Sequence, residues 1–314
     1  MQKGPPTPKG FRDINPENAK KRRTVISKIA DVLEENGFVP LETPTVEFAQ
    51  TLEGKYGEEE KLIYKFEDRG GRELALRYDL TVPLARYIAN NQQLIEKGPF
   101  RRYQIGQVFR GENPQAGRYR EFTQFDFDTA GSNNLEEDAK IISTAIRSIR
   151  KLGLKEARMA VNDRDTLSVF VADEIRVIDK IEKIGISGVE KELKQHGKTE
   201  AEISKVKKFL TDNKPNPPKN LQTVFDVLKN KYKLVEDIDF YFDHTLARGL
   251  DYYTGSIFEL KPSTQSGNLS IGAGGRYDNL IGMFVYPDKG GAEKDIPAVG
   301  FSFGIDRLIE AISG

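Results

Sequence analysis

The chain has 314 residues, enough for one large domain or two smaller ones. Lysine plus arginine and aspartate plus glutamate number 48 each, so the net charge is zero and a polyanion site must be a local patch. Cysteine is absent and only two histidines occur, which excludes disulfides, cysteine nucleophiles and Cys- or His-rich metal sites. No apolar run approaches the ~20 residues of a membrane-spanning helix. The start shows no signal-type segment, so we expect a cytoplasmic protein without membrane contact.

The first part of the chain predicts a helix followed by strands. Asn15-Pro16 is typical of a helix start, and Asn36-Gly37 is typical of a helix end. Alternation of apolar and polar residues then predicts a short strand, a hairpin and a second strand pair, at 38–41, 61–78, and about 101–112 with 118–128.

The second part predicts a helix, an insertion and a return to strands. Asn134 begins a helix with acidic residues in its first turn and basic residues in its last, and Gly153 ends it. Residues 171–235 are rich in lysine and glutamate and helical in pattern, which indicates a helical insertion domain between 1–170 and 236–314. Four strands and a final helix are expected at 238–242, 256–261, 269–275, 298–304 and 306–312. We therefore expect an α+β fold with a six- or seven-stranded antiparallel sheet, flanking helices and a helical insertion.

The second strand pair carries a distinctive set of side chains around a loop at 113–117. Side chains alternate between the faces of a strand, so Arg110 and Glu112 share a face. An arginine for phosphate, an aromatic plate for a base, and amide and carboxylate groups suit a nucleotide plus a small zwitterion. The alternative is an ordinary solvated face, the default for antiparallel sheets. The second strand places five side chains on one face: Arg120, Phe122, Gln124, Asp126 and Asp128.

These residues resemble a known enzyme class. Phe109–Glu112, a loop and then Arg118–Phe122 resemble motif 2 of class II aminoacyl-tRNA synthetases. Residues 37–47 resemble motif 1, and Ala298–Leu308 resembles motif 3, in the order of that class. The resemblance implies a class II-type antiparallel sheet flanked by helices. It also implies a homodimer, since motif 1 segments of this class pair across a two-fold axis.

Further segments resemble histidyl-tRNA synthetases. Leu246–Gly255 and Gly274–Leu280 resemble the two histidine-specific signatures, and Leu76–Pro83 resembles the amino-group site in its archaeal and eukaryotic wording. Gly10–Asp13 also matches, and the resemblance extends from about residue 5 to the end. It implies ATP-dependent activation of histidine to histidyl-adenylate and transfer to tRNA(His), with release of diphosphate and AMP.

The signatures also have plainer interpretations. Arg248–Tyr253 could be a turn followed by a strand whose tyrosines pack on a sheet. Gly272, Gly274 and Gly275 could form a bulge or a tight turn. Alternatively, their missing side chains allow close approach of the backbone to a ligand.

The resemblance implies an ATP site with Mg²⁺ on the β- and γ-phosphates. Arg110 would bridge the α-phosphate and the histidine carboxylate, and Arg248 would be a second catalytic cation at the α-phosphate. Arg307 would take the γ-phosphate, and Phe122 would stack on adenine. Two more residues would help to place ATP, Glu112 and Arg118.

The resemblance also implies a histidine site. A site that hydrogen-bonds both imidazole nitrogens rejects analogues that lack them. Asp79 stands where bacterial relatives often carry glutamate, so its contact is expected to reach less far. The implied residues are Asp79, Thr81 and Gln124 at the amino end, Asp128, Tyr253 and Tyr277 at the imidazole, and Arg248 and Tyr252 beside them.

The acceptor end of tRNA would meet the loop at 113–120, with Gln115 and Arg120 as candidate contacts. The basic run 20–23 could assist, but a solvated helix face is favoured. His196 is expected in an exposed turn and His244 as a packed or hydrogen-bonded residue, neither with a role. No metal-ligating side chains are expected.

Two other functions stay open. Family members carry a C-terminal anticodon-binding domain, whereas this chain ends shortly after Arg307, so we expect a truncated catalytic core or a single-domain relative that still activates histidine. A non-catalytic paralogue, such as the regulatory subunit of ATP phosphoribosyltransferase or a tRNA or histidine sensor, is the first alternative. It is disfavoured because such paralogues lose ATP-site residues that this chain keeps. A protein–protein module built on 171–235 is the second.

Overall fold

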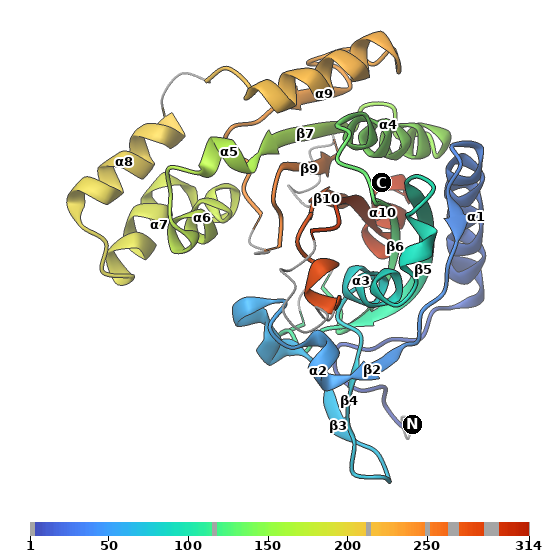
Figure 1. Cartoon of the computed structure of the whole chain (residues 1–314). Coiled ribbons are helices and arrows are strands. Elements are labelled where there is room, and N and C mark those ends of the chain that lie inside the picture. Colours follow the sequence, from blue (N-terminus) through green and yellow to red (C-terminus); the bar gives the residue numbers. More distant parts are fainter. Residues whose placement is uncertain are drawn as a thin grey trace.

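The computed structural model describes residues 4–114, 118–211, 215–248, 252–262, 270–285 and 295–313. A large sheet with eight described strands forms the centre of the molecule, and helices cover it (Figure 1). In spatial order the strands are β1 (Val39–Pro40), β5 (Phe100–Phe109), β6 (Glu121–Ala130), β11 (Ala298–Gly304), β10 (Gly272–Arg276), β9 (Ser256–Lys261), β7 (Arg158–Asp163) and β8 (Phe240–Phe242).

The inner strands of this sheet pair antiparallel, as expected. The expected number of strands is wrong, because β7 was not predicted. The sheet is also not wholly antiparallel, because β1 pairs with β5 and β8 pairs with β7 in parallel at the two edges. Both edge strands lie within the predicted strands at 38–41 and 238–242, but the residues of a strand do not indicate the direction of its neighbour. The predicted α+β fold with flanking helices is confirmed.

A second sheet of three strands lies beside the first and supports one wall of the site. It has the order β2 (Val46–Phe48), β4 (Glu73–Leu76) and β3 (Lys65–Glu67), and β3 with β4 forms the predicted hairpin. Helix α3 (Thr81–Ala89) accompanies it, together with four short helices: α2 (Ala49–Leu52), η1 (Gly57–Leu62), η2 (Gln92–Leu94) and η3 (Gly282–Phe284). The segment between β4 and α3 therefore has both of its ends fixed.

One face of the large sheet is packed against helices. Asn15 caps the first helix by accepting from the backbone of Asn18 at 2.8 Å, and Gly37 ends it with a φ of 82°. Phe125 and Phe127 of β6 are buried in this core, together with the apolar face of α4. The helices of this layer are α1 (Pro16–Glu35), α4 (Glu136–Lys151), α9 (Lys219–Asn230) and α10 (Ile305–Ser313).

The inserted helices lie to one side of the sheet (Figure 1), and their apolar side chains share a cluster with Ala160 of β7 and Ile257 of β9. They are α5 (Arg164–Leu167), α6 (Ala172–Ile178), α7 (Ile181–Gln195) and α8 (Glu200–Thr211). In contrast, Leu221 and Phe225 of α9 are buried in the main core. The division at 171–235 stays a prediction, and the packing of α9 favours a subdomain of α6 to α8. Within the described residues, no helix is long and apolar enough to cross a bilayer.

The basic run at 20–23 is not uniformly solvated. Lys20, Lys21 and Arg23 are exposed, as expected for a surface helix. Arg22, however, is 13% exposed and donates to Asp306 and to the hydroxyl of Thr123. The expectation of a solvated face is wrong for Arg22, because the long-range partner Asp306 cannot be inferred from local sequence.

Candidate active site

A cavity of about 910 Å³ lies over the face of the large sheet that is opposite to the helix-backed core. The alternation along β6 explains its floor, because Phe125 and Phe127 point into the core while the intervening residues point into the cavity. The common face predicted for this strand is confirmed for Phe122, Gln124, Asp126 and Asp128, which all line the cavity.

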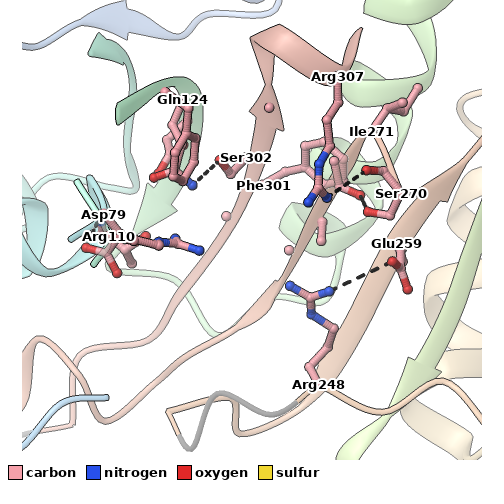
Figure 2. A pocket seen from close by; sticks show the side chains of 18 of the residues that line it. Asp79, Arg110, Gln124, Arg248, Glu259, Ser270, Ile271, Phe301, Ser302 and Arg307 are labelled. Carbon is pink, nitrogen blue, oxygen red and sulfur yellow. Dashed lines mark hydrogen bonds and ion pairs between the residues drawn. The ribbon is translucent and has the colours of Figure 1, made fainter. Parts of the chain in front are cut away.

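The cavity is rich in arginine. Arg110, Arg118, Arg248 and Arg307 line it, and they come from four different segments of the chain. Figure 2 shows the guanidinium groups of Arg110, Arg248 and Arg307 pointing into the same space. Burial lowers the pKa of Arg307, and the nearby charges of Arg118 and Arg110 lower it further. Arg307 therefore lies in a region of positive potential, which favours the binding of an anion.

Two of these arginines reach few acceptors within the protein. Arg307 donates from Nη1 to the carbonyl of Ser270 at 3.3 Å. Arg248 Nη1 lies 3.9 Å from Glu259 Oε1, and its buried Nε has no hydrogen-bond partner among the described residues (Figure 2). Donors held in a buried position without acceptors are available to a ligand.

Arg110 is held between two aromatic rings. Its guanidinium carbon lies 4.3 Å from the ring centroid of Tyr78 and 5.1 Å from that of Phe122. Its Nε also donates to the carbonyl of Tyr78 at 3.2 Å. Planar stacking of this kind suits arginine and fixes the direction of its remaining N–H groups.

The cavity also contains acceptors, beginning with Asp79 between β4 and α3, which lies beside Arg110 (Figure 2). Its Oδ1 accepts from the first-turn amides of Thr81 and Val82 at 3.1 and 2.9 Å, and from the hydroxyl of Tyr56 at 3.1 Å. Burial raises the pKa of Asp79, and these hydrogen bonds oppose the rise. The start of α3 thus fixes the carboxylate against the cavity.

Gln124 offers a free acceptor. Its Nε2 donates to Ser302 Oγ at 3.0 Å, as Figure 2 shows. Its buried Oε1 has no hydrogen-bond partner among the described residues. The amide orientation is therefore fixed by Ser302 and leaves an oxygen for a donor from a ligand.

Asp128 is paired inside the protein. Its Oδ1 accepts from the hydroxyl of Tyr277 at 2.5 Å, and its Oδ2 lies 2.8 Å from Arg102 Nη2. Burial raises the pKa of Asp128, whereas the charge of Arg102 lowers it. Tyr252 and Tyr253 stand beside this pair, since the Tyr252 ring is 6.0 Å from that of Tyr277 and 4.9 Å from that of Tyr253. The structure thus brings the expected histidine-site residues together.

The glycines of β10 and β11 make room for these side chains. A Cβ on Gly275 would lie 2.6 Å from the Tyr253 ring, and one on Gly300 would lie 1.8 Å from Asp128 Oδ1. A Cβ on Gly274 would lie 2.1 Å from the carbonyl oxygen of Gly300. The interpretation of Gly272–Gly275 as a bulge or tight turn is wrong, because β10 is a regular strand paired on both sides.

Some expected site residues lie elsewhere. Arg118 pairs with Glu112 at 3.1 Å on the cavity wall. Arg120 does not line the cavity, and its Nε donates to the carbonyl of Glu112 at 2.9 Å, so its tRNA contact stays a prediction. Gln115 lies outside the described residues, as do residues 249–251 of the first histidine signature.

The two histidines have no place in the cavity lining. His244 is packed against the ring of Phe209, and its Nε2 lies 3.1 Å from the carbonyl of that residue, as predicted. His196 is exposed and ends α7, also as predicted. The described residues contain no group of three His, Asp or Glu side chains that could hold a metal ion.

The cavity also contains residues that the sequence did not single out. Tyr78 and Ser302 lie next to expected site residues, so their neighbours could have suggested them. Asp126 shares the predicted face of β6 but had no assigned role. A further group comes from the junction of α6 and α7, for which no local signal exists: Asp179, Glu182 and Lys183.

Comparisons with known proteins agree with this geometry. The family profile described as "Histidyl-tRNA synthetase" matches residues 10–175 and 187–308. The chain is 43% identical to "Histidine--tRNA ligase" of Aeropyrum pernix, over 98% of this chain and 74% of that protein. It is 39% identical to "Histidine--tRNA ligase" of Helicobacter acinonychis, over 98% of this chain and 75% of the relative. The crystal structure of histidyl-tRNA synthetase from Nostoc superposes with a TM-score of 0.81 at 29% identity, over 99% of this chain and 76% of that one. The chain belongs to the histidyl-tRNA synthetase family.

Proposed function

We propose that this chain activates histidine with ATP to histidyl-adenylate and then transfers histidine to tRNA(His). The observation that carries the proposal is the composition of one cavity, which combines four arginines with buried, unpaired acceptors. A polyphosphate suits the arginines, and an amino acid with several N–H groups suits the acceptors. The paralogue alternative is disfavoured, since the relatives named above are ligases and the arginines of the ATP site are present.

The arginines of the cavity would serve the first step, the formation of histidyl-adenylate. An oxygen of the histidine carboxylate forms a bond to the α-phosphorus of ATP, and the bond from that phosphorus to the diphosphate oxygen breaks. Because both reactants are anionic, cations must lie between them. Arg110 and Arg248 are the proposed catalytic residues, and Arg307 would bind the γ-phosphate. Neither step needs a nucleophile from the protein, since tRNA later attacks the adenylate and releases AMP.

The rest of the ATP site follows from the same wall. Phe122 would stack on adenine, while Glu112 and Arg118 would help to place the nucleotide. Magnesium usually binds through substrate phosphates and one or two carboxylates rather than through a complete protein cage. The carboxylates of Glu112 and Glu259 line the cavity and fit that pattern. They would complete the coordination of an ion held by the β- and γ-phosphates.

The hydrogen-bond acceptors of the cavity would hold histidine. Its ammonium group has three N–H donors. Gln124 Oε1 and Asp79 are acceptors that face the cavity, and Thr81 stands beside them at the start of α3. The α-carboxylate would be directed to the arginines. The imidazole would lie among the remaining residues of this group: Asp128, Tyr252, Tyr253 and Tyr277.

Three features outside the cavity complete the proposal. Gln115 and Arg120 would meet the acceptor end of tRNA. A homodimer is supported by large apolar side chains exposed on β1 and the second sheet, including Val39 at 47% and Phe48 at 49%. We place the enzyme in the cytoplasm, where its substrates occur.

The test is histidine-dependent exchange of diphosphate into ATP on the 314-residue chain, with the other amino acids as controls. Arg248→Ala should reduce exchange by about 10²- to 10³-fold, the usual cost of losing one preorganised donor to a transition state. Arg69→Ala removes an exposed arginine of the β3–β4 turn and should leave exchange unchanged. Binding of histidine without any exchange by the wild-type chain would favour the regulatory paralogue.

A further inference from the structure

The motif Gly10–Asp13 lies outside the cavity, at a turn of the chain. The amide of Phe11 donates to the carbonyl of Pro8 at 3.0 Å, and Gly10 has a φ of 88°, a conformation that favours glycine. The amide of Arg120 donates to the carbonyl of Gly10 at 2.9 Å. The turn is therefore joined to the chain directly before β6.

The side chain of Arg120 strengthens this junction. Its Nη1 donates to the carbonyl of Lys9 at 3.4 Å, and its Nε donates to the carbonyl of Glu112 at 2.9 Å. The packing is close, because a Cβ on Gly10 would lie 2.8 Å from both Cγ and Cδ of Arg120. The N-terminal segment and the residues that lead into β6 are thus packed against each other.

Arg12 reaches the wall of the cavity from outside. Its guanidinium carbon lies 3.5 Å from the ring centroid of Tyr119, which lines the cavity. Arg12 also pairs with the carboxylate of Asp306, another residue of the cavity wall. Arg12 itself is 31% exposed and is not among the lining residues. One side chain outside the cavity therefore holds two parts of its wall together.

Asp306 is the fixed side of this bridge. It is 8% exposed, pairs with Arg22 of α1, and its Oδ2 accepts from the amide of Thr123 at 3.1 Å. Tyr119, in contrast, precedes Glu121, the first residue of β6. Arg12 therefore joins a residue outside the strand to a carboxylate that is anchored at the start of the strand.

The two residues that Arg12 holds are chain neighbours of two cavity arginines. Tyr119 directly follows Arg118, and Asp306 directly precedes Arg307. Burial lowers the pKa of Arg307, and the charge of Arg118 lowers it further, so the two cations repel each other. A bridge between their neighbours holds both arginines in place before an anion arrives, which reduces the cost of binding that anion.

We propose that Arg12 is a positioning residue for the ATP site, because its bridge from Tyr119 to Asp306 fixes the spacing of Arg118 and Arg307. The inference rests on the proposed function and deepens it, since it names a residue outside the cavity that sets the affinity for the polyphosphate. Histidine affinity should not depend on Arg12. The acceptors proposed for the ammonium group are held elsewhere, by the first-turn amides of α3 and by the hydroxyl of residue 302.

Binding of ATP with Mg²⁺ to the 314-residue chain, measured by titration calorimetry without histidine, tests the inference directly. Arg12→Ala should weaken binding by about 10-fold, the range expected for a stacked cation in a partly buried position. Arg12→Lys keeps the charge for Asp306 but cannot lie flat on Tyr119, so its loss should be smaller. Arg23→Ala removes an exposed arginine of α1 and should leave ATP affinity unchanged. Unchanged ATP affinity in Arg12→Ala would overturn the inference.

Histidine binding to the same variants separates positioning from folding. Histidine affinity, measured by calorimetry without ATP, should stay within about twofold of wild type in Arg12→Ala and Arg12→Lys. A loss of histidine affinity in parallel with ATP affinity would mean that Arg12 supports the whole domain, and the inference would be wrong.

A double-mutant cycle tests whether Arg12 acts through Tyr119. Tyr119→Leu removes the ring on which Arg12 stacks and should itself weaken ATP binding. If the two residues act as one unit, the double variant should bind ATP within about threefold of the weaker single variant. Losses that multiply in the double variant would show independent action and would contradict the proposed bridge.

Gly10→Ala shifts the segment while Arg12 is kept. The new Cβ would collide with the side chain of Arg120, so ATP binding should weaken by at least about threefold. Gly153→Ala is the matched control for backbone strain, because Gly153 has a φ of 96° and no heavy atom within 4 Å of its Cβ position. Equal ATP affinities of the two variants would show that the position of the N-terminal segment does not matter.

The two proposals fail in different ways. A wild-type chain that binds ATP in an Arg12-dependent manner but shows no histidine-dependent exchange would remove the synthetase activity and keep the inference. A chain with normal exchange whose ATP affinity is unchanged in Arg12→Ala would do the reverse.

Discussion

The carboxylate of Asp128 occupies the space that a side chain on Gly300 would need. The two residues are register partners on β6 and β11, and a Cβ on Gly300 would lie 1.8 Å from Asp128 Oδ1. The absence of a side chain at position 300 is therefore a condition for the pairing of Asp128 with Arg102 and Tyr277. A motif glycine here has a packing role that can be tested separately from any contact with a ligand.

Gly300→Ala should displace Asp128 and break its contacts with Arg102 and Tyr277. Because Arg102 would stay buried and lose its carboxylate partner Asp128, the free energy of unfolding should fall by about 3 kcal/mol. Urea denaturation measures this loss, and histidine affinity should fall with it. Gly304→Ala is the matched control for stability, since the nearest atom to its Cβ would be Arg307 Cδ at 4.0 Å. Equal stability of the two variants would refute the steric argument.

Arg110→Lys tests whether the stacked guanidinium matters beyond its charge. Lysine keeps the charge but cannot lie flat between the rings of Tyr78 and Phe122 or make bidentate contacts. We expect exchange to fall by about 10²-fold, mostly in kcat. Arg69→Lys, in the exposed turn, is the control. Activity within about twofold of wild type in Arg110→Lys would mean that a point charge suffices.

Asp306 should be a stability residue as well as a neighbour of the cavity. It is 8% exposed, pairs with Arg12 and Arg22, and its Oδ2 accepts from the backbone of Thr123 at 3.1 Å. Asp306→Asn should lower the free energy of unfolding by up to about 3 kcal/mol, since it leaves two cations with a neutral partner. Lys21→Ala removes an exposed pair with Glu17 and should cost less than about 0.5 kcal/mol. Urea midpoints that do not rank the variants in this order would contradict the assignment.

Asp126 should give the protein a pH-dependent stability. Burial raises the pKa of Asp126 to about 7, with Asp128 adding to the rise and Arg102 opposing it. Between the unfolded value of about 4 and this one, the folded chain holds a proton that the unfolded chain has lost. Stability therefore falls as the pH rises through this window, by at most ~1.4 kcal/mol per pH unit.

Asp126→Asn should remove that contribution. Relative to wild type, the variant should gain stability as the pH is raised from 5 to 7, because its amide does not titrate. Urea midpoints of both proteins at the two pH values measure the difference. A constant difference would show that Asp126 titrates in its ordinary range.

The elements of the fold were predictable where local rules decide them. The cap at Asn15 and the end at Gly37 define α1, and alternation defines β5, β6 and the β3–β4 hairpin. The edge strands were predicted but their parallel pairing was not, since a strand's own residues do not indicate the direction of its neighbour, and β7 was not predicted at all. Arg22 escaped as well, because its partner Asp306 is 284 residues away in the chain.

The site was predictable in outline only. The alternation of side chains along a strand placed Asp126 and Asp128 on one face of β6, and nothing in the local sequence distinguishes them. The contacts of Asp128 with Arg102 on the neighbouring strand and with Tyr277 after β10 come from the tertiary fold. Asp179 of the α6–α7 junction could not be found at all, because the packing of the inserted helices brings it to the cavity.

Strand β6 has the core on one side and the substrate cavity on the other, which restricts how the gene can change in length. Inserting or deleting one residue between Phe122 and Asp128 would turn the following side chains over, so that phenylalanines would enter the cavity and carboxylates the apolar core. Such a change would destroy catalysis and folding together. Length variation between homologues should therefore be confined to the connection before β6, where an added residue leaves both faces of the strand unchanged.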